Sequence, residues 1–188
     1  MLFRSFIRLA PDDANVPLVR RELQKLLARP THELATLSAA RRTAIAYTRQ
    51  VDQLLSNSAA TRKDLGKLIA NFDSGQETVL DAQQQIQSII NQRQSLENAI
   101  ATVITPAAFV QADNLLRDSV AAALSDDTAI QTWIDAVAQG GKASAAGQWS
   151  DHLQATARAT KAKQAFVSAY NRVRARYGLG PFAIGSSY

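Results

Sequence analysis

The sequence contains no cysteine and only two histidines in its 188 residues. The lack of cysteine excludes disulfides, thiolate metal ligands and cysteine nucleophiles, and two histidines leave little for an imidazole metal site. Glycine and proline are also scarce, with eight and five residues, and aromatic residues make up only 6%. No apolar run approaches the roughly 18 residues that cross a bilayer. The sequence therefore predicts no transmembrane segment.

Alanine and glutamine are abundant, with 34 and 16 residues. Both residue types favour helices, whereas the scarce glycine and proline interrupt them. Hydrophobic residues make up 46% and charged residues 20% of the chain, which is typical of a folded protein. We expect an all-α protein: an elongated helical bundle with a long helical hairpin or a single long helix, and with extended N- and C-terminal arms.

Residues 1–30 combine an apolar and basic arm with a short helix. Asn15 and Pro17 are typical of a helix N-cap and first turn, and Pro30 is expected to end the helix. The arm is expected to dock on the chain's own core or on a neighbouring subunit, with a membrane surface as a third alternative. The arm residues expected to dock are Leu2, Phe3, Phe6 and Ile7.

Residues 31–104 carry an apolar repeat with alternating spacings of four and three residues. Polar residues interrupt this repeat at several positions. An interrupted repeat fits helices packed in a bundle better than one continuous two-stranded coiled coil. The interruptions include Ser58, Arg62 and Arg93.

A break is expected near the middle of the same segment. Ser74 and Glu77 match the S-x-x-E capping box, which marks the start of a helix. The pattern therefore predicts an antiparallel hairpin of two helices, over about 31–72 and 75–104. One unbroken helix is the alternative, and at 1.5 Å per residue it would exceed about 100 Å.

Residues 105–177 are expected to form three helices. Thr105-Pro106 starts the first, because proline suits the first helical position. Asp126-Asp127 is expected to cap the second, short helix in a solvated turn, and Gly140-Gly141 to end it. The tryptophans of this segment are expected to anchor the core; they are Trp133 and Trp149.

The third of these helices is long and basic. It is expected to start near Ser144 and to run to Tyr177, with Gly178 at the C′ position. Residues 178–188 then form an extended tail with apolar side chains, which is expected to be a second docking arm. The tail residues expected to dock are Pro181, Phe182, Ile184 and Tyr188.

Three short patterns resemble reactive sites but lack the geometry for them. Ser150-Asp151-His152 has the residue types of a catalytic triad, but neighbours on a helix point about 100° apart. Glu77 and Asp81 share a helical face, but the Glu-x-x-His motifs of a di-iron bundle are missing. Gly140–Ser144 lacks the spacing and the preceding strand of a phosphate-binding loop. We therefore expect no enzyme and no catalytic, cofactor-binding or metal-binding residues.

The net charge of +5 conceals three segments of alternating sign. Residues 1–70 carry a net +6, residues 71–151 a net −7 and residues 152–188 a net +6. In the last helix a basic face lies within an arc of about 60°, beside a stripe of alanines and aromatics. The residues of this basic face are Arg158, Lys161, Arg172 and Arg176.

This charge pattern favours subunits that meet one another, because docking between copies uses both signs, whereas nucleic-acid binding uses only the positive ends. We expect a non-enzymatic structural or assembly protein of a large particle, most simply a head, portal-adaptor or tail joining protein of a bacteriophage. Its partners would be further copies and neighbouring structural proteins, and its location the virion, or otherwise the cytoplasm. The alternatives are a nucleic-acid-binding protein that uses helix 152–177, and a helical subunit of a membrane-associated or organellar complex.

Overall fold

The computed structural model describes the backbone of residues 16–183, and the side chains of Arg21 and of residues 38–183. Within that part the chain forms four α-helices, one short 3₁₀ helix and no strand, which confirms the all-α prediction. The chain divides into two compact units, residues 1–43 and 44–188. The elements are α2 (Val16–Asp73), α3 (Val79–Thr102), η1 (Ala107–Phe109), α4 (Val110–Ser144) and α5 (Ala146–Arg176).

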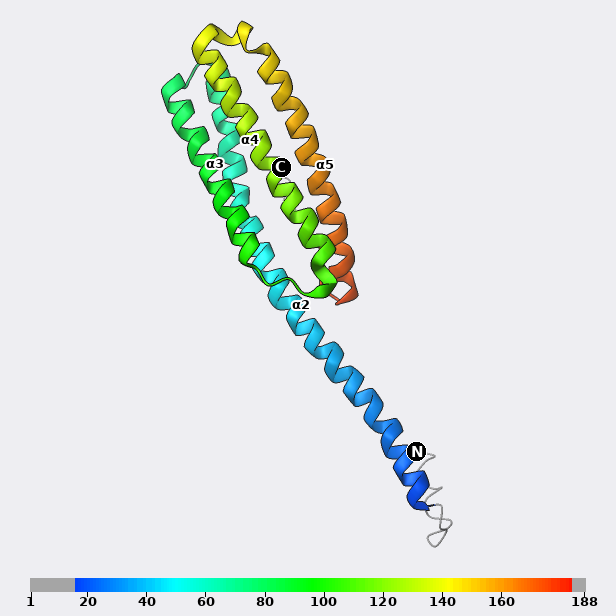
Figure 1. Ribbon diagram of the computed structural model, residues 1–188. Helices are drawn as coiled ribbons and strands as arrows, with labels where there is room; N and C mark the ends of the chain where they lie inside the picture. Colours follow the sequence, from blue (N-terminus) through cyan, green and yellow to red (C-terminus); the bar gives the residue numbers. More distant parts are fainter. Residues whose placement is uncertain (1–15, 184–188) are drawn as a thin grey trace. The chain divides into compact units, whose positions relative to one another are not determined.

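The second unit is a four-helix bundle (Figure 1). Short connections join each helix to the next at alternate ends, so successive helices run antiparallel. Both α3 and α5 pack against α4. The part of α2 within this unit also reaches α3, because Thr61 Oγ1 donates a hydrogen bond of 2.8 Å to Gln92 Oε1.

Helix α2 begins at Val16, directly after the expected N-cap position. It then continues through Pro30, so the helix end expected there is wrong. A proline removes one backbone donor and bends a helix, but the remaining hydrogen bonds of a 58-residue helix can carry it across.

The connection between α2 and α3 lies where the sequence predicted a break, which excludes a single rod over 31–104. The predicted capping pair is wrong, however. Thr78 is the N-cap of α3, and its Oγ1 accepts from the backbone N–H of Asp81 and donates to the Asp81 carboxylate. Gly75 turns the chain just before it, with a φ of 75°. The capping pattern occurs in the same sequence four residues later, with an aspartate in place of glutamate.

Helix α4 joins two helices that the sequence predicted to be separate. The chain stays helical through Asp126-Asp127, and both side chains are buried, with exposures of 2% and 1%. The predicted solvated cap is therefore wrong, because both carboxylates have partners on other helices. The predicted end at Gly140-Gly141 is confirmed, since Gly141 has φ 77° and ψ 173° and leaves the helical conformation.

The connection from α4 to α5 contacts the C-terminal end of α2. Lys142 Nζ lies 3.1 Å from Asp73 Oδ1 and also donates to the Asp73 carbonyl. The phosphate-loop-like segment at 140–144 is thus a turn between two helices. Helix α5 ends at Arg176, and Gly178 adopts a positive φ of 65°, as predicted for a glycine that follows a helix.

Two apolar clusters fill the bundle. The aromatic cluster lies where α4 begins and α5 ends, and its largest members are Tyr47, Phe109, Phe166 and Tyr170. The isoleucine cluster contains Ile86, Ile89, Ile90, Ile130 and Ile134 together with Phe72 and Trp133. Trp149 packs against it from α5, with its ring centroid 4.7 Å from that of Trp133. Both tryptophans therefore lie at the core, as predicted.

Candidate functional site

A layer of buried polar side chains separates the two apolar clusters. Along every helix of the second unit, these polar residues fall between residues of the aromatic cluster and residues of the isoleucine cluster. The polar layer is formed by Ser58, Thr61, Arg93, Asp126, Asp127 and His152. Charged groups in the middle of a bundle need partners, because their transfer from water is costly.

One contact of this layer joins α3 to α4. Arg93 Nε donates to Asp127 Oδ2 at 3.1 Å, and Arg93 Nη1 donates to Ser58 Oγ of α2 at 2.7 Å. The two charged side chains are exposed by only 5% and 1%. Burial raises the pKa of Asp127, and the guanidinium of Arg93 opposes this shift. Arg93 Nη2 is buried and has no hydrogen-bond partner.

A second contact joins α4 to α5. His152 Nδ1 lies 2.8 Å from Asp126 Oδ1, and Thr156 Oγ1 donates to the same oxygen at 2.9 Å. The carboxylate partner of this histidine is therefore Asp126, from another helix, while Asp151 and Ser150 are exposed. The three adjacent residues at 150–152 thus do not converge, as the helical spacing predicted. The Trp149 ring packs on His152 with centroids 4.8 Å apart.

Two further carboxylates hold tyrosines at the aromatic cluster. Tyr170 OH donates to Asp52 Oδ1 at 3.0 Å, and Arg174 Nη1 lies 2.7 Å from Asp52 Oδ2. Tyr47 OH donates to Asp113 Oδ1 at 3.0 Å. Burial, followed by the nearby carboxylates, raises the pKa of both tyrosines, so they stay protonated donors at neutral pH.

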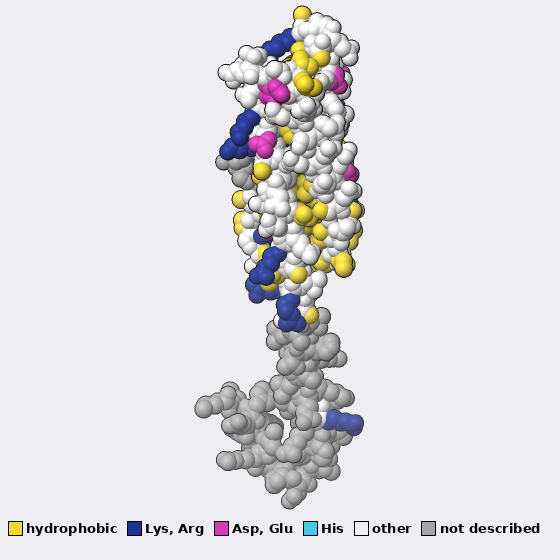
Figure 2. All heavy atoms as spheres, turned by 90° about the vertical axis from the view of Figure 1, so that its left-hand side faces the viewer, with side chains coloured by type: hydrophobic (Ala, Val, Ile, Leu, Met, Phe, Trp, Pro, Cys, Tyr) yellow, Lys and Arg dark blue, Asp and Glu magenta, His cyan; other side chains and the backbone are white. Residues whose placement is uncertain are grey.

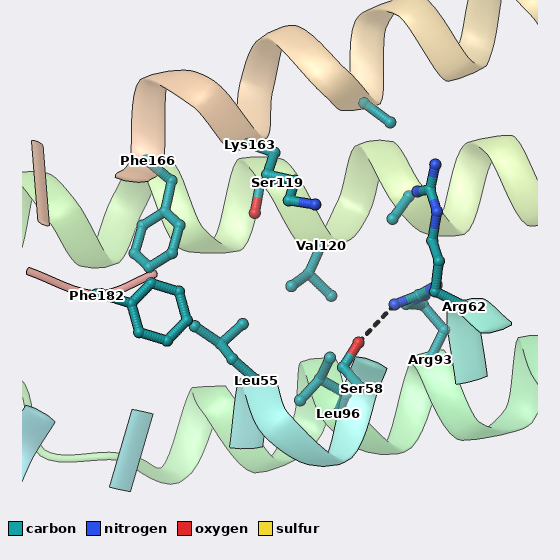
Figure 3. Close-up of a pocket in the computed structure, with 12 residues that line it drawn as sticks. Leu55, Ser58, Arg62, Arg93, Leu96, Ser119, Val120, Lys163, Phe166 and Phe182 are labelled. Carbon is teal, nitrogen blue, oxygen red and sulfur yellow. Dashed lines mark hydrogen bonds between the residues drawn. The ribbon is translucent and has the colours of Figure 1, made fainter. Parts of the chain in front are cut away.

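A small cavity of about 50 Å³ opens between the polar layer and the aromatic cluster. Figure 3 shows Arg62 and Arg93 on one side of it, Phe166 and Phe182 on the other, and Lys163 between them. Burial lowers the pKa of Lys163 to about 7, and the positive charges of the two arginines add to this effect. All charged residues that line the cavity are cations.

The outer face of α5 carries the predicted basic residues. Arg158, Lys161, Arg172 and Arg176 are all exposed, and none has an ion pair or a hydrogen bond with the part of the chain that the structure describes. The predicted alanine and aromatic stripe lies on the buried side of the helix, beside this basic face. The side of the molecule nearest α3 instead shows basic and acidic side chains scattered among uncharged ones (Figure 2).

The acidic segment 71–151 offers less surface charge than its net −7 suggests. Three of its carboxylates are buried in contacts with cationic or hydrogen-bonding side chains. The buried carboxylates are Asp113, Asp126 and Asp127. Asp73, Asp81, Asp118 and Asp151 remain exposed.

Most residues predicted to form docking arms lie outside the described part of the chain. These are Leu2, Phe3, Phe6, Ile7, Ile184 and Tyr188. Of the other two, Pro181 is exposed, whereas Phe182 packs on the aromatic cluster and contacts Tyr170, with ring centroids 5.7 Å apart. Asn171 holds it there, donating to the Phe182 carbonyl at 3.1 Å and accepting from its N–H at 2.6 Å. The tail thus docks on its own core as far as residue 183.

Two other expectations concern metals and membranes. The described residues contain no group of three or more histidine, aspartate or glutamate side chains that would hold a metal ion, and Glu77 and Asp81 belong to none. Across the helices that the structure describes, none has the length and hydropathy to span a bilayer.

The polar layer was not predicted from the sequence, although the sequence contains a signal for it. Ser58, Arg62 and Arg93 stand at core positions of the apolar repeat, where a polar residue needs a partner. The partners lie far away in sequence, so the repeat alone did not reveal the layer. No protein-family model, no curated protein and no solved structure matches this chain.

Proposed function

We propose that the protein is a non-enzymatic assembly protein whose copies associate through the outer face of α5. The observation that carries the proposal is the set of four exposed cations on that face, which have no partner among the described residues. Other charged side chains of the bundle already contact each other within the chain. A face of one sign that is left unpaired complements an acidic surface of another molecule.

A second copy supplies such an acidic surface. Asp73, Asp81, Asp118 and Asp151 are exposed on the helices or connections that precede α5 or at its start. Attraction between surface charges is screened over about 8–10 Å at physiological salt. Association through this face should therefore weaken as the salt concentration rises.

Sedimentation velocity over a range of salt concentrations tests the proposal. The wild-type protein should sediment as an oligomer at low salt, and the double variant Arg172→Glu/Arg176→Glu as a monomer at every salt concentration. The matched control is Arg49→Glu/Lys63→Glu, which makes the same charge change on exposed positions of α2. A monomeric wild-type protein, or equal effects of the two double variants, would contradict the proposal.

Nucleic-acid binding is the competing use of the same face. A titration with duplex DNA in the same buffers separates the two, because each lost phosphate contact lowers the salt dependence of binding by about one unit. Tight duplex binding by a monomeric protein, lost in Arg172→Glu/Arg176→Glu, would replace the assembly proposal with this one.

More specifically, we propose that the assembly is a bacteriophage virion and that residues 31–104 form the full hairpin. The segments that contain Phe3 and Tyr188 would dock on neighbouring subunits. A deletion of residues 184–188 leaves the packed Phe182 in place. That deletion should leave the helicity unchanged and reduce the size of the assembly, whereas an unchanged sedimentation coefficient would rule out a docking role for the last five residues.

A further inference from the structure

The cavity beside the polar layer has two chemically different halves (Figure 3). Leu55, Leu96, Val120, Phe166 and Phe182 line one half with apolar surface. The other half presents Arg62, Arg93 and Lys163, from three different helices, and the hydroxyl groups of Ser58 and Ser119. Basic and hydroxyl groups that converge from separate helices are donors suited to an anion.

The hydrogen bonds of Arg93 leave part of its charged group without a partner. Two of its three guanidinium nitrogens are bonded, to Asp127 and to Ser58, while Nη2 is buried without a partner. A buried donor without an acceptor costs about 1–3 kcal/mol, and more when it is charged. Most buried polar atoms in proteins avoid this cost. Arg93 also lines the cavity, so an anion there would partly compensate its charge.

The positive charges around the neighbouring Lys163 also favour a bound anion. Lys163 lies near enough to Arg62 and Arg93 for their charges to lower its pKa, in addition to the larger effect of burial. Among the described side chains, the carboxylate bonded to Arg93 is that of Asp127, while Asp126 is bonded to His152 and Thr156. A bound anion would stabilise the protonated form of Lys163 and offset the repulsion among the three cations.

We propose that this cavity binds a small oxyanion, of the size of phosphate or acetate, through the guanidinium group of Arg93, the ammonium group of Lys163 and the hydroxyl group of Ser58. The size follows from the volume of about 50 Å³, since a water molecule needs roughly 10–15 Å³ on the same scale. A nucleotide is too large for it. The ion would link α2, α3 and α5 and stabilise the bundle from within.

Thermal unfolding with added sodium phosphate, at constant ionic strength set with sodium chloride, tests the proposal. The midpoint Tm of the wild-type protein should rise by several degrees, because a ligand that binds only the folded state stabilises it by mass action. Lys163→Met should lose this phosphate-dependent shift. Lys63→Met is the matched control, since it removes the same charge at an exposed position of α2 outside the proposed association face, and it should keep the shift.

Parallel titrations identify the ion. Sodium acetate in place of phosphate distinguishes a carboxylate from a phosphate ligand, and either response, if lost in Lys163→Met, supports the site. Phosphate also strengthens burial in any protein. An equal rise of Tm in Lys163→Met and Lys63→Met would therefore show a general salt effect and overturn the proposal, as would the absence of any rise in the wild-type protein.

A second readout does not depend on stability. The ¹³Cε chemical shift of Lys163 follows its protonation, and saturating phosphate should raise its pKa from about 7 by at least one unit. The groups that face this lysine are Arg62 and Arg93, with Asp127 bonded to the latter. An unchanged pKa would contradict binding next to Lys163. The lysine pKa does not depend on oligomer size, so its failure to change leaves the assembly proposal intact.

Discussion

The outer face of α5 and the middle of the bundle both concentrate positive charge, but only the middle places it beside buried carboxylates. Arg172 and Arg176 lie in water, where screening leaves an ion pair worth about 0–1 kcal/mol. Arg93 and its partner Asp127 are nearly inaccessible, so loss of one leaves an uncompensated charge in the interior. The same side chain type therefore supports folding in one region and is free to serve association in the other.

The largest effect should come from Arg93. Arg93→Met leaves Asp127 buried without its cation and should lower the free energy of unfolding by about 3–5 kcal/mol, measured by urea denaturation. The double variant Arg93→Met/Asp127→Leu removes both charges and should recover most of that loss. If the single variant costs less than about 1 kcal/mol, the interior pair does not differ from surface charges.

A smaller loss is expected at Asp52, which is partly exposed. Asp52→Ala deprives both Tyr170 OH and Arg174 of their acceptor, and hydrogen bonds to charged groups contribute about 1.5–3 kcal/mol. Urea denaturation measures the change. Asp64→Ala is the control, because its contact with Lys67 is exposed and 3.6 Å long, and it should cost no more than about 0.5 kcal/mol.

The burial of Lys163 should make the free energy of unfolding depend on pH. Its pKa is about 7 in the folded protein and 10.5 when exposed, so between these values the unfolded chain holds a proton that the folded protein lacks. Stability therefore rises with pH from about pH 7 to about pH 9, before the tyrosines of the unfolded chain ionise. The slope should be smaller in Lys163→Met than in Lys161→Met, measured by urea denaturation in a series of buffers. Equal slopes would show that Lys163 is solvated like a surface lysine.

The smallest effect on stability should come from the outer face of α5. Arg172→Gln/Arg176→Gln should change the free energy of unfolding by less than about 0.5 kcal/mol, since neither side chain has a partner within the described chain. The comparison with Arg93→Met uses the same urea titration. A loss above about 1 kcal/mol would show that these cations stabilise the fold itself.

Local signals in the sequence predicted most of the helix boundaries. Gly141 and Gly178 mark the ends of helices because a positive φ suits glycine, and this preference acts within a few residues. The break between α2 and α3 was also local, although Thr78 rather than Ser74 forms the cap. Pro30 shows the limit of such signals, because a strong local breaker lies within a continuous helix.

The interior of the bundle was not predictable in the same way. From local sequence alone, Asp126-Asp127 resembles a solvated cap. Its burial depends on Arg93, which lies 34 residues from Asp127, and on His152, which lies 26 residues from Asp126. The basic face of α5 was predictable, because the 3.6-residue period alone groups its cations in one arc beside the alanine stripe. Which residues are charged could be read from the sequence, but which of them lose contact with water depends on how the helices align.

The polar layer also fixes how the helices align along their axes. An apolar seam of similar side chains tolerates a slide of one helical turn, about 5.4 Å, because another apolar residue takes each vacated place. A slide of α4 by one turn would separate Asp127 from Arg93 and Asp126 from His152 at the same time. The misaligned bundle would bury these four side chains without their partners. The two contacts therefore favour a single register of α3, α4 and α5.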